Sequence, residues 1–407
     1  VKAGTPILAD KKHPEILICS PASGIVKEIV RGEKRKLLQI LIQADKKQEY
    51  AHSNAHELCK NGTAQELKEA LLSSGLWAMI KQRPYGTVAD PAKEPKAIFI
   101  SGFDSAPLAA DMDYAMKSEF DNMQMGVNIL TKLSKGGVHI GLHADTFAGS
   151  PMHRLEKAKI HVFDGPHPAG NVGVQIHHIS PINKGETVWT LDLYTLAAIG
   201  KLFNKGVFDL RRVIAVAGPK AKKPSYVETL PGMAIREVAD LTDSSNEVRY
   251  GDEVGVRYIS GNVLTGENVG KDGYTGIFHN VITVMAEGNY REMFGWIKPL
   301  RDKKFSISRS YFSWLMPNKQ YNLDTNLNGG ERAFVVTGVY EKVLPMDILP
   351  LYLFKAILAE DIDKMEQLGI YEVIEEDVAL CEFVCPSKSD IQDIVSRGIN
   401  IMIKEMS

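Results

Sequence analysis

The chain has 407 residues, of which 44% are hydrophobic and 24% are charged. This length exceeds what one hydrophobic core can serve, so roughly two to four domains are expected. The 48 basic residues nearly balance the 50 acidic ones, and the net charge of −2 excludes a protein whose whole surface is drawn to nucleic acid or to an anionic membrane. Apolar runs such as Met346 to Leu358 fall short of the ~20 residues that span a bilayer, so no transmembrane segment is predicted.

The first residues and the cysteines bear on the cellular compartment. The chain begins Val1-Lys2-Ala3-Gly4, without an initiator Met and without the charged and apolar regions of a signal peptide. We therefore expect it to start inside a longer polypeptide. Cys19, Cys59, Cys381 and Cys385 are too few for the disulfide framework of a secreted protein, so a reducing cytoplasm is expected.

Residues 1–45 predict a small β module. Short apolar runs alternate with turns there, as in an antiparallel sheet: Pro6–Leu8, Ile16–Ile18, Gly24–Val26 and Leu37–Ile42. The segments Lys2–Leu8 and Ser20–Val26 resemble the lipoyl- and biotinyl-type barrel-sandwich hybrid. That family modifies a Lys in a tight turn beside Met or Asp, and no such turn appears around Asp10-Lys11-Lys12. A structural barrel is therefore favoured over a carrier domain.

Residues 60–205 predict a Rossmann-like α/β domain. Apolar periodicity and glycine stop signals indicate three helices, at Gln65–Gly75, Phe120–Leu133 and Thr190–Phe203. Short apolar runs indicate three strands, at Ala97–Ile100, Val138–Leu142 and Ile160–Phe163. Strands that alternate with helices imply a parallel sheet with crossover helices.

The remaining residues predict a β-grasp domain, similar to the SLBB type, at 206–310 and a helical region at 311–407. The β-grasp domain opens with the strand Arg212–Ala217, a strand at Tyr226–Glu228 and a helix at Ala234–Leu241. Three further strands are expected to complete its sheet: Arg257–Ser260, Phe278–Met285 and Phe305–Ser308. Helical spacing then marks Ile348–Leu358, Asp361–Leu368 and Ile391–Met406.

Long collinear motifs across these regions carry a family resemblance. They are Val162–Gly170, Leu196–Phe203, Ala217–Pro219, Phe294–Trp296, Asn328–Ala333, Pro345–Pro350 and Glu375–Pro386. Together they resemble the A-subunit family of the bacterial sodium-translocating NADH:quinone reductases. The domain order is similar, more remotely, to the flavoprotein subunit of respiratory complex I and the C subunit of the Rnf complex.

The resemblance implies a peripheral subunit on the cytoplasmic face of the bacterial inner membrane. Its partners would be the other subunits of a complex that uses NADH, flavins, iron–sulfur and quinone while it exports sodium. The family has been linked to binding of a quinone, ubiquinone or menaquinone. Two alternatives remain: an independent flavin- or NADH-dependent dehydrogenase, and a scaffold without any ligand.

The flavin-bearing relatives carry a glycine-rich loop that this chain lacks. Gly75 to Gly86 instead contains Trp77, Met79 and Ile80, which place bulk where a bare backbone would approach a phosphate. We expect no FMN there, although Lys81 and Arg83, taken as exposed, could still meet a phosphate. No Gly-x-Gly-x-x-Gly follows a strand, so no dinucleotide fingerprint is found.

Iron ligation is also not expected. A [4Fe–4S] cluster takes four Cys ligands, and this region offers only Cys381 and Cys385. We interpret the two as vestigial and apolar in setting, with a Cys-bridged metal between subunits as an alternative.

The quinone hypothesis names an apolar slot in the remodelled flavin cleft. Aromatic and proline side chains would line it, and Asp104 or His167 would bond the head group: Trp77, Tyr85, Phe103 and Pro107. His167 is singled out because it lies in a Gly/Pro-rich loop at the carboxyl end of a strand, where open α/β sheets place ligands.

Other histidines are expected to be structural. His139 and His143 on one strand would be ~13 Å apart, too far to share an ion. His177 and His178 are predicted on a strand with opposite orientations, so at most one could share a site with His167.

Overall fold

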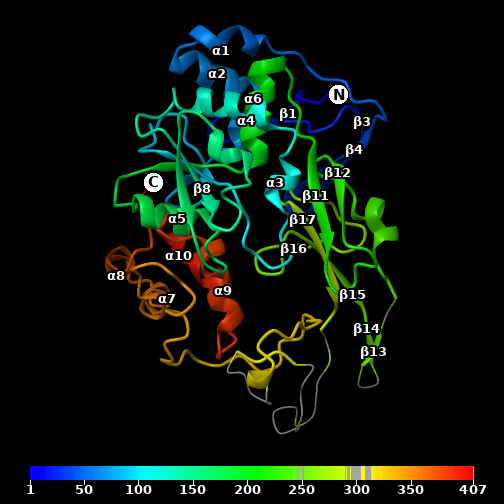
Figure 1. The fold of residues 1–407 in the computed structure, drawn as a ribbon, viewed down its shortest axis with the longest axis vertical. Helices are drawn as coiled ribbons and strands as arrows, with labels where there is room; N and C mark the ends of the chain where they lie inside the picture. Colours follow the sequence, from blue (N-terminus) through cyan, green and yellow to red (C-terminus); the bar gives the residue numbers. More distant parts are fainter. Residues whose placement is uncertain are drawn as a thin grey trace.

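The computed structural model describes residues 1–245, 247–249, 252–288, 290, 294, 304–307 and 313–406. It contains an N-terminal β module, an α/β domain, a β-grasp sheet and a helical C-terminal region, which confirms the predicted fold class. Figure 1 shows helices α7 to α10 below the α/β domain and the β-grasp strands beside it. The largest buried apolar cluster belongs to the α/β domain and includes Ile16 and Cys19 of the N-terminal module, while the β-grasp sheet and the C-terminal region have clusters of their own.

The N-terminal module consists of two antiparallel hairpins, as predicted. Strand β1 (Pro6–Ala9) pairs with β2 (Leu17–Cys19), and β3 (Gly24–Arg31) pairs with β4 (Leu37–Ala44). A short 3-10 turn, η1 (Glu33–Arg35), joins β3 to β4.

The α/β domain is built on a six-stranded sheet in the order β6-β5-β10-β7-β8-β9. Its strands are β5 (Lys81–Arg83), β6 (Thr87–Val88), β7 (Ile98–Ser101), β8 (Val138–His143), β9 (Ala158–Phe163) and β10 (Val188–Thr190). Strands β10, β7, β8 and β9 are parallel, while β5 and β6 extend the sheet antiparallel. The carboxyl ends of the four parallel strands therefore meet at one edge, where α/β sheets place ligands.

Helices cover this sheet and close its crossovers. They are η2 (Asn54–Glu57), α1 (Leu58–Asn61), α2 (Ala64–Ser74), η3 (Leu76–Met79), α3 (Met112–Ala115), α4 (Phe120–Leu130), η4 (Pro151–Arg154), α5 (Val172–Ile179) and α6 (Leu193–Lys205). Helix α2 starts in a capping box between Thr63 and Glu66 and ends at Gly75 in the left-handed conformation, as the sequence predicts. Helices α4 and α6 approach so closely that a Cβ at Gly200 would lie 1.7 Å from the carbonyl oxygen of Asn122.

Two predictions in this domain are wrong. His177 and His178 lie in helix α5, which forms the crossover from β9 to β10, rather than on a strand. The short run Val174-Gln175-Ile176-His177 alternates apolar and polar residues as a strand does, which explains the error. Helix α6 begins at Leu193 and not at Thr190, because Thr190 ends strand β10 and Asp192 caps the helix.

The β-grasp sheet has the order β12-β11-β17-β15-β16. Its strands are β11 (Arg212–Ala217), β12 (Ser225–Thr229), β15 (Val256–Ser260), β16 (Glu267–Asn268) and β17 (Val281–Ala286), with η5 (Ile235–Leu241) packed on it and the hairpin β13 (Glu247–Arg249) and β14 (Asp252–Val254) beside it. The strand predicted at Phe305 is not found in the described residues 305–307, and Ser308 lies outside the described part of the chain.

The C-terminal region is helical, as predicted. After η6 (Ser313–Leu315) it contains α7 (Pro350–Leu358), α8 (Ile362–Gln367), α9 (Glu375–Val384) and α10 (Ile391–Met406). None of the helices in the described residues is long and apolar enough to cross a membrane.

Candidate functional site

A cavity of about 360 Å³ opens at the carboxyl ends of β7, β8 and β9. The loops that follow the three strands supply its walls: Gly102, Phe103, Asp104, Ser105, Ala110, Asp111, Met112, Asp113, His143, Thr146, Gly165, Pro166 and His167. Its volume falls within the range of small-molecule sites. The fold therefore places a ligand-sized cavity where parallel α/β sheets bind their ligands.

His167 presents an unused hydrogen-bonding nitrogen at this cavity. Its Nδ1 lies 3.0 Å from the Ser105 hydroxyl oxygen, which also accepts the backbone N–H of Gly170 at 2.8 Å. The Ser105 O–H can then donate to Nδ1, and in that tautomer the imidazole proton is on Nε2. This Nε2 is buried and has no protein partner. A buried N–H donor without an acceptor is costly, and a ligand oxygen would relieve that cost.

The charge of the cavity is acidic. Asp104, Asp111 and Asp113 line it, and none of its described lining residues is Lys or Arg. Asp104 is held in place, because its two oxygens accept from the backbone N–H of Ala106 and the side-chain amide of Asn280. Burial lowers the pKa of His167, although the carboxylates of Asp104 and Glu376 oppose that shift, so the imidazole is neutral at pH 7. Phosphates would be repelled here, and an uncharged ligand is favoured.

Apolar groups form the rest of the wall. The ring of Phe103 meets the His143 imidazole edge to face, with ring centroids 5.1 Å apart. Met112 and Pro166 lie on the same cavity, and the Asn280 amide contacts the Met112 sulfur at 3.7 Å. Asn280 precedes β17, so the β-grasp domain fixes groups that line a cavity of the α/β domain.

The structure brings three of the six predicted slot residues together. Phe103, Asp104 and His167 line the cavity. Trp77 does not, because it is fully buried in the core, where its Nε1 donates to the carbonyl of Ala89 at 2.8 Å. Tyr85 also lies elsewhere and packs against Tyr371 of the C-terminal region.

Pro107, the last slot residue, is exposed and is not among the lining residues. Sequence reasoning missed Ser105, Met112, Asp113 and His143. A signal was available for Ser105, since it follows Asp104 in the loop after a predicted strand. Asn280 belongs to the β-grasp domain, and no local sequence pattern predicts its contacts with Asp104 and Met112.

The expectation that Arg83 is exposed is wrong. Its side chain is 1% exposed and forms ion pairs with Asp377 Oδ2 at 2.5 Å and Glu376 Oε1 at 2.6 Å. Both carboxylates belong to the start of α9, so the guanidinium joins strand β5 to the C-terminal region. His177 adds a second link by pairing with Glu372 at 2.8 Å. Arg83 is thus committed to domain packing and is not available to a phosphate.

Two of the cysteines lie in the interior of the C-terminal region. Cys381 and Cys385 are both fully buried against Tyr340, whose hydroxyl lies 3.1 Å from the Cys385 sulfur. Burial raises the pKa of Cys381 to about 12, and burial also raises that of Cys19 to about 11, so both are protonated thiols at neutral pH. In the described residues no group of three or more His, Cys, Asp or Glu side chains could hold a metal ion.

Thiol labelling should reflect this burial. In the native protein at pH 8 we expect iodoacetamide to modify Cys59, which is partly exposed, and to leave Cys19, Cys381 and Cys385 unmodified until urea unfolds the chain. Mass spectrometry of the labelled peptides measures the order of reaction. Rapid native labelling of Cys381 would contradict the buried setting.

His139 has a different partner from the one considered in the sequence. Its Nδ1 lies 2.9 Å from His161 Nε2 on the neighbouring strand β9, while His143 is at the far end of β8. Burial, with smaller effects of Lys159 and His161, lowers the pKa of His139 to about 4. The two rings form a neutral pair on the sheet.

This low pKa predicts how stability depends on pH. A histidine whose pKa is lowered by folding contributes stability above its unfolded pKa of about 6.5, and that contribution is lost as the pH falls towards 4. The NMR titration of His139 should therefore show an inflection near pH 4. In a His139→Gln variant the decline of unfolding free energy between these pH values should be shallower. An inflection near 6.5 would contradict the buried pair.

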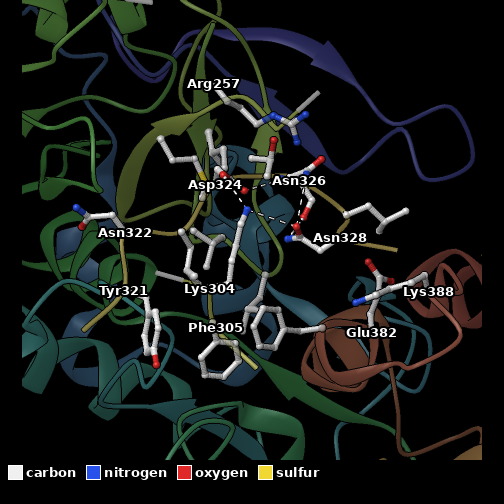
Figure 2. Close-up of a pocket in the computed structure, with 18 of the residues that line it drawn as sticks. Arg257, Lys304, Phe305, Tyr321, Asn322, Asp324, Asn326, Asn328, Glu382 and Lys388 are labelled. Atoms are coloured by element: carbon white, nitrogen blue, oxygen red, sulfur yellow. Dashed lines mark hydrogen bonds and ion pairs between the residues drawn. The ribbon is translucent and has the colours of Figure 1, made fainter. Parts of the chain in front are cut away.

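A second, larger cavity of about 1340 Å³ lies between the β-grasp sheet and α9. In Figure 2 Lys304 points towards Asp324, and its ammonium lies 4.0 Å from that carboxylate. Lys304 also bonds the Tyr290 hydroxyl at 2.8 Å. Arg257 is similarly paired with Glu287. Because these cations are already paired within the protein, size alone does not make it the better candidate, and the smaller cavity with the unpartnered His167 is preferred.

Comparison with models of known protein families gives matches between residues 1 and 271. Three family models match: the NqrA N-terminal barrel-sandwich hybrid domain at residues 1–45, the NqrA second alpha/beta domain at 62–208 and the NQRA C-terminal domain at 213–271. Among solved structures, the air-oxidized NAD+-reducing [NiFe]-hydrogenase aligns with a TM-score of 0.37 and 12% identity over 86% of this chain and 64% of that chain, too little to support any inference.

Curated relatives match over nearly the whole chain. The A subunit of the Na(+)-translocating NADH-quinone reductase from Serratia proteamaculans (strain 568) is 39% identical over 402 residues, which is 97% of this chain and 86% of that protein. The protein with the same name from Neisseria meningitidis serogroup B (strain ATCC BAA-335 / MC58) is 36% identical over 409 residues, 100% of this chain and 89% of that protein. The chain therefore belongs to the NqrA family, the A subunits of the Na(+)-translocating NADH-quinone reductases.

Proposed function

We propose that the chain is a peripheral subunit of a sodium-translocating NADH:quinone reductase and holds no redox cofactor of its own. Its partners are the other subunits of that complex, and its place is the cytoplasmic face of the bacterial inner membrane. Support comes from the family membership and from the names of the relatives. The complex as a whole would couple NADH oxidation and quinone reduction to sodium export.

The absence of a flavin is proposed from the chemistry of the region. Trp77, Met79 and Ile80 stand where the relatives have the glycine-rich loop, and all three are buried in the core. Their side chains leave no bare backbone that a flavin phosphate could approach. The acidic cavity would also repel the phosphate of FMN or NADH. A purified chain should therefore be colourless, and a flavin or iron–sulfur absorption band in it would favour the rival function, an independent dehydrogenase.

We further propose that the cavity holds the head group of a quinone. The observation that carries this proposal is the buried Nε2–H of His167, which has no acceptor in the protein and lies at a partly aromatic wall. A quinone carbonyl is a neutral acceptor that fits this donor, while the rings of Phe103 and His143 offer a surface for its flat ring.

A pair of substitutions isolates the Nε2 donor. His167→Asn places its amide near the position of Nδ1 and keeps the contact with Ser105, but it removes the donor at Nε2; His167→Gln extends to the Nε2 position. We expect His167→Asn to weaken binding of a short-chain ubiquinone or menaquinone analogue about tenfold, and His167→Gln to weaken it less. Equilibrium dialysis with the purified chain measures both.

Pro107→Ala, which changes an exposed residue outside the cavity, serves as the control and should leave the affinity unchanged. Absence of saturable binding to the native chain would refute the quinone site and leave the scaffold function. Equal affinity in all three variants would show that quinone binds somewhere other than at His167.

A further inference from the structure

His143 lies at the small cavity, one strand away from the loop that holds His167. It is the last residue of β8, which pairs in parallel with β9, and His167 lies in the loop that follows β9. Both side chains line the cavity, and that of His143 is 21% exposed. Because the carboxyl ends of neighbouring parallel strands meet at one edge of the sheet, the two imidazoles border the same space from adjacent positions.

The turn that follows β8 fixes the proton of the His143 imidazole. The backbone N–H of Asp145 donates to Nδ1 at 3.2 Å, and a backbone amide nitrogen can only donate. Nδ1 therefore carries a lone pair and no proton. The Asp145 carboxylate lies 3.8 Å from the same nitrogen, beyond hydrogen-bond distance, so it does not compete for it. A neutral imidazole with a bare Nδ1 has its proton on Nε2.

The Nε2–H of His143 is left for a ligand. In the part of the chain that the structure describes, the hydrogen bond of this side chain is made by Nδ1. The two nitrogens of an imidazole point outwards on different sides of the ring, so Nε2 is directed away from the turn that Nδ1 contacts. His167 offers the same group by another route, the contact of its Nδ1 with the Ser105 hydroxyl. Two imidazole donors thus serve one cavity.

The acceptors of the cavity, by contrast, have donors within the protein. Besides Asp104, whose two oxygens are already engaged, Asp111 accepts the backbone N–H of Tyr114 at 3.1 Å. Asp113 accepts the Ser150 hydroxyl at 2.5 Å. A donor without an acceptor is costly when it is removed from water, so two such donors favour a ligand that carries two acceptors. A quinone ring carries one carbonyl oxygen at each end.

We propose that His143 is a second specificity-determining residue of the quinone site, with its Nε2–H bonded to one carbonyl of the head group while the Nε2–H of His167 bonds the other. This assignment rests on the proposed function and deepens it. The cavity then selects flat rings that carry two carbonyls. A related ring with a single carbonyl leaves one imidazole donor unpaired and binds more weakly.

Paired ligands and paired variants test the proposal. All chains carry Cys59→Ser, because the partly exposed thiol of Cys59 could add to a quinone. Equilibrium dialysis compares naphthoquinone with tetralone, which keeps the fused rings and one carbonyl. The parent chain should bind naphthoquinone about tenfold more tightly. His143→Asn keeps an acceptor near Nδ1 but has no donor at Nε2, so it should bind both ligands equally. His143→Gln extends to the Nε2 position and should restore part of the preference.

Nuclear magnetic resonance reads the tautomer independently of binding. Long-range proton–nitrogen spectra of the chain with nitrogen-labelled histidine should show His143 and His167 both in the Nε2–H form. A proton on Nδ1 of His143 would overturn the proposal. A parent chain that bound the two ligands equally, or a naphthoquinone preference that survived in His143→Asn, would overturn it as well.

The same measurements separate this proposal from the quinone site itself. Pro107→Ala, outside the cavity, should keep both the affinity and the preference of the parent chain. Equal loss of both ligands in His143→Asn and His143→Gln would give His143 a packing role only and overturn its role as a donor. Absence of saturable binding of either ligand to the parent chain would refute the quinone site and this proposal together, whereas binding with an unchanged preference in His143→Asn refutes this proposal alone.

Discussion

Replacing Asp377 with alanine is expected to lower the free energy of unfolding by about 3–5 kcal/mol. The substitution leaves the Arg83 guanidinium, which is 1% exposed, without its fully buried partner. Glu376 remains in contact but is 41% exposed, so it compensates only in part. Thermal and urea unfolding followed by circular dichroism measure the loss. Hydrogen exchange should show it first in α9, which carries the pair.

Two variants separate the buried charge from ordinary loss of contacts. Glu376→Ala removes the exposed partner and should cost about 1 kcal/mol or less. Arg83→Met combined with Asp377→Leu removes both charges and should recover much of the stability lost in Asp377→Ala, since apolar groups of similar size replace a buried pair well. If the double variant were as unstable as Asp377→Ala, the loss would come from packing and not from the unpaired charge.

Replacing Trp77 with alanine is also expected to cost about 3–5 kcal/mol of unfolding free energy. The side chain is fully buried, its ring packs edge to face on Trp189 with centroids 5.1 Å apart, and its N–H bonds the Ala89 carbonyl. Chemical denaturation followed by circular dichroism is the suitable measurement, because the substitution removes a fluorophore.

The control for Trp77 lies elsewhere in the chain. Trp314→Ala removes a Trp that is 58% exposed and should change stability by about 0.5 kcal/mol or less. Trp77→Phe should fall between the two, since it keeps most of the ring volume and loses the hydrogen bond. Loss of quinone binding in Trp77→Ala without any loss of stability would restore Trp77 as a ligand contact.

The sequence predicted elements well where one physical signal dominated. Strand β11 and helix α10 have the predicted bounds. The apolar run of β11 and the apolar stripe at helical spacing in α10 each fit only one type of secondary structure. Helix α5 was missed because a short helix can carry the alternation of a strand, and only the need to cross from β9 to β10 makes it helical.

The candidate site was predicted only in part for a similar reason. The rule that ligands gather at the carboxyl ends of strands located His167, while the comparison with the flavin cleft named Phe103 and Asp104; all three line the same cavity. Trp77 and Arg83 were misjudged because the sequence shows bulk and charge but not burial. Their partners, Trp189 and Asp377, are more than 100 residues away in the chain, so only the tertiary structure reveals that both are committed to the interior.

The carboxylates around the small cavity have a consequence for competition inside the cell. Nucleotides and sugar phosphates are abundant and would crowd any open cleft of an α/β sheet that offered them a cation. Three aspartates line this cleft, with no lysine or arginine among the described lining groups, so its electrostatic potential is negative. Phosphate-bearing metabolites are therefore expected to compete poorly for this cleft with an uncharged ligand of the kind proposed above.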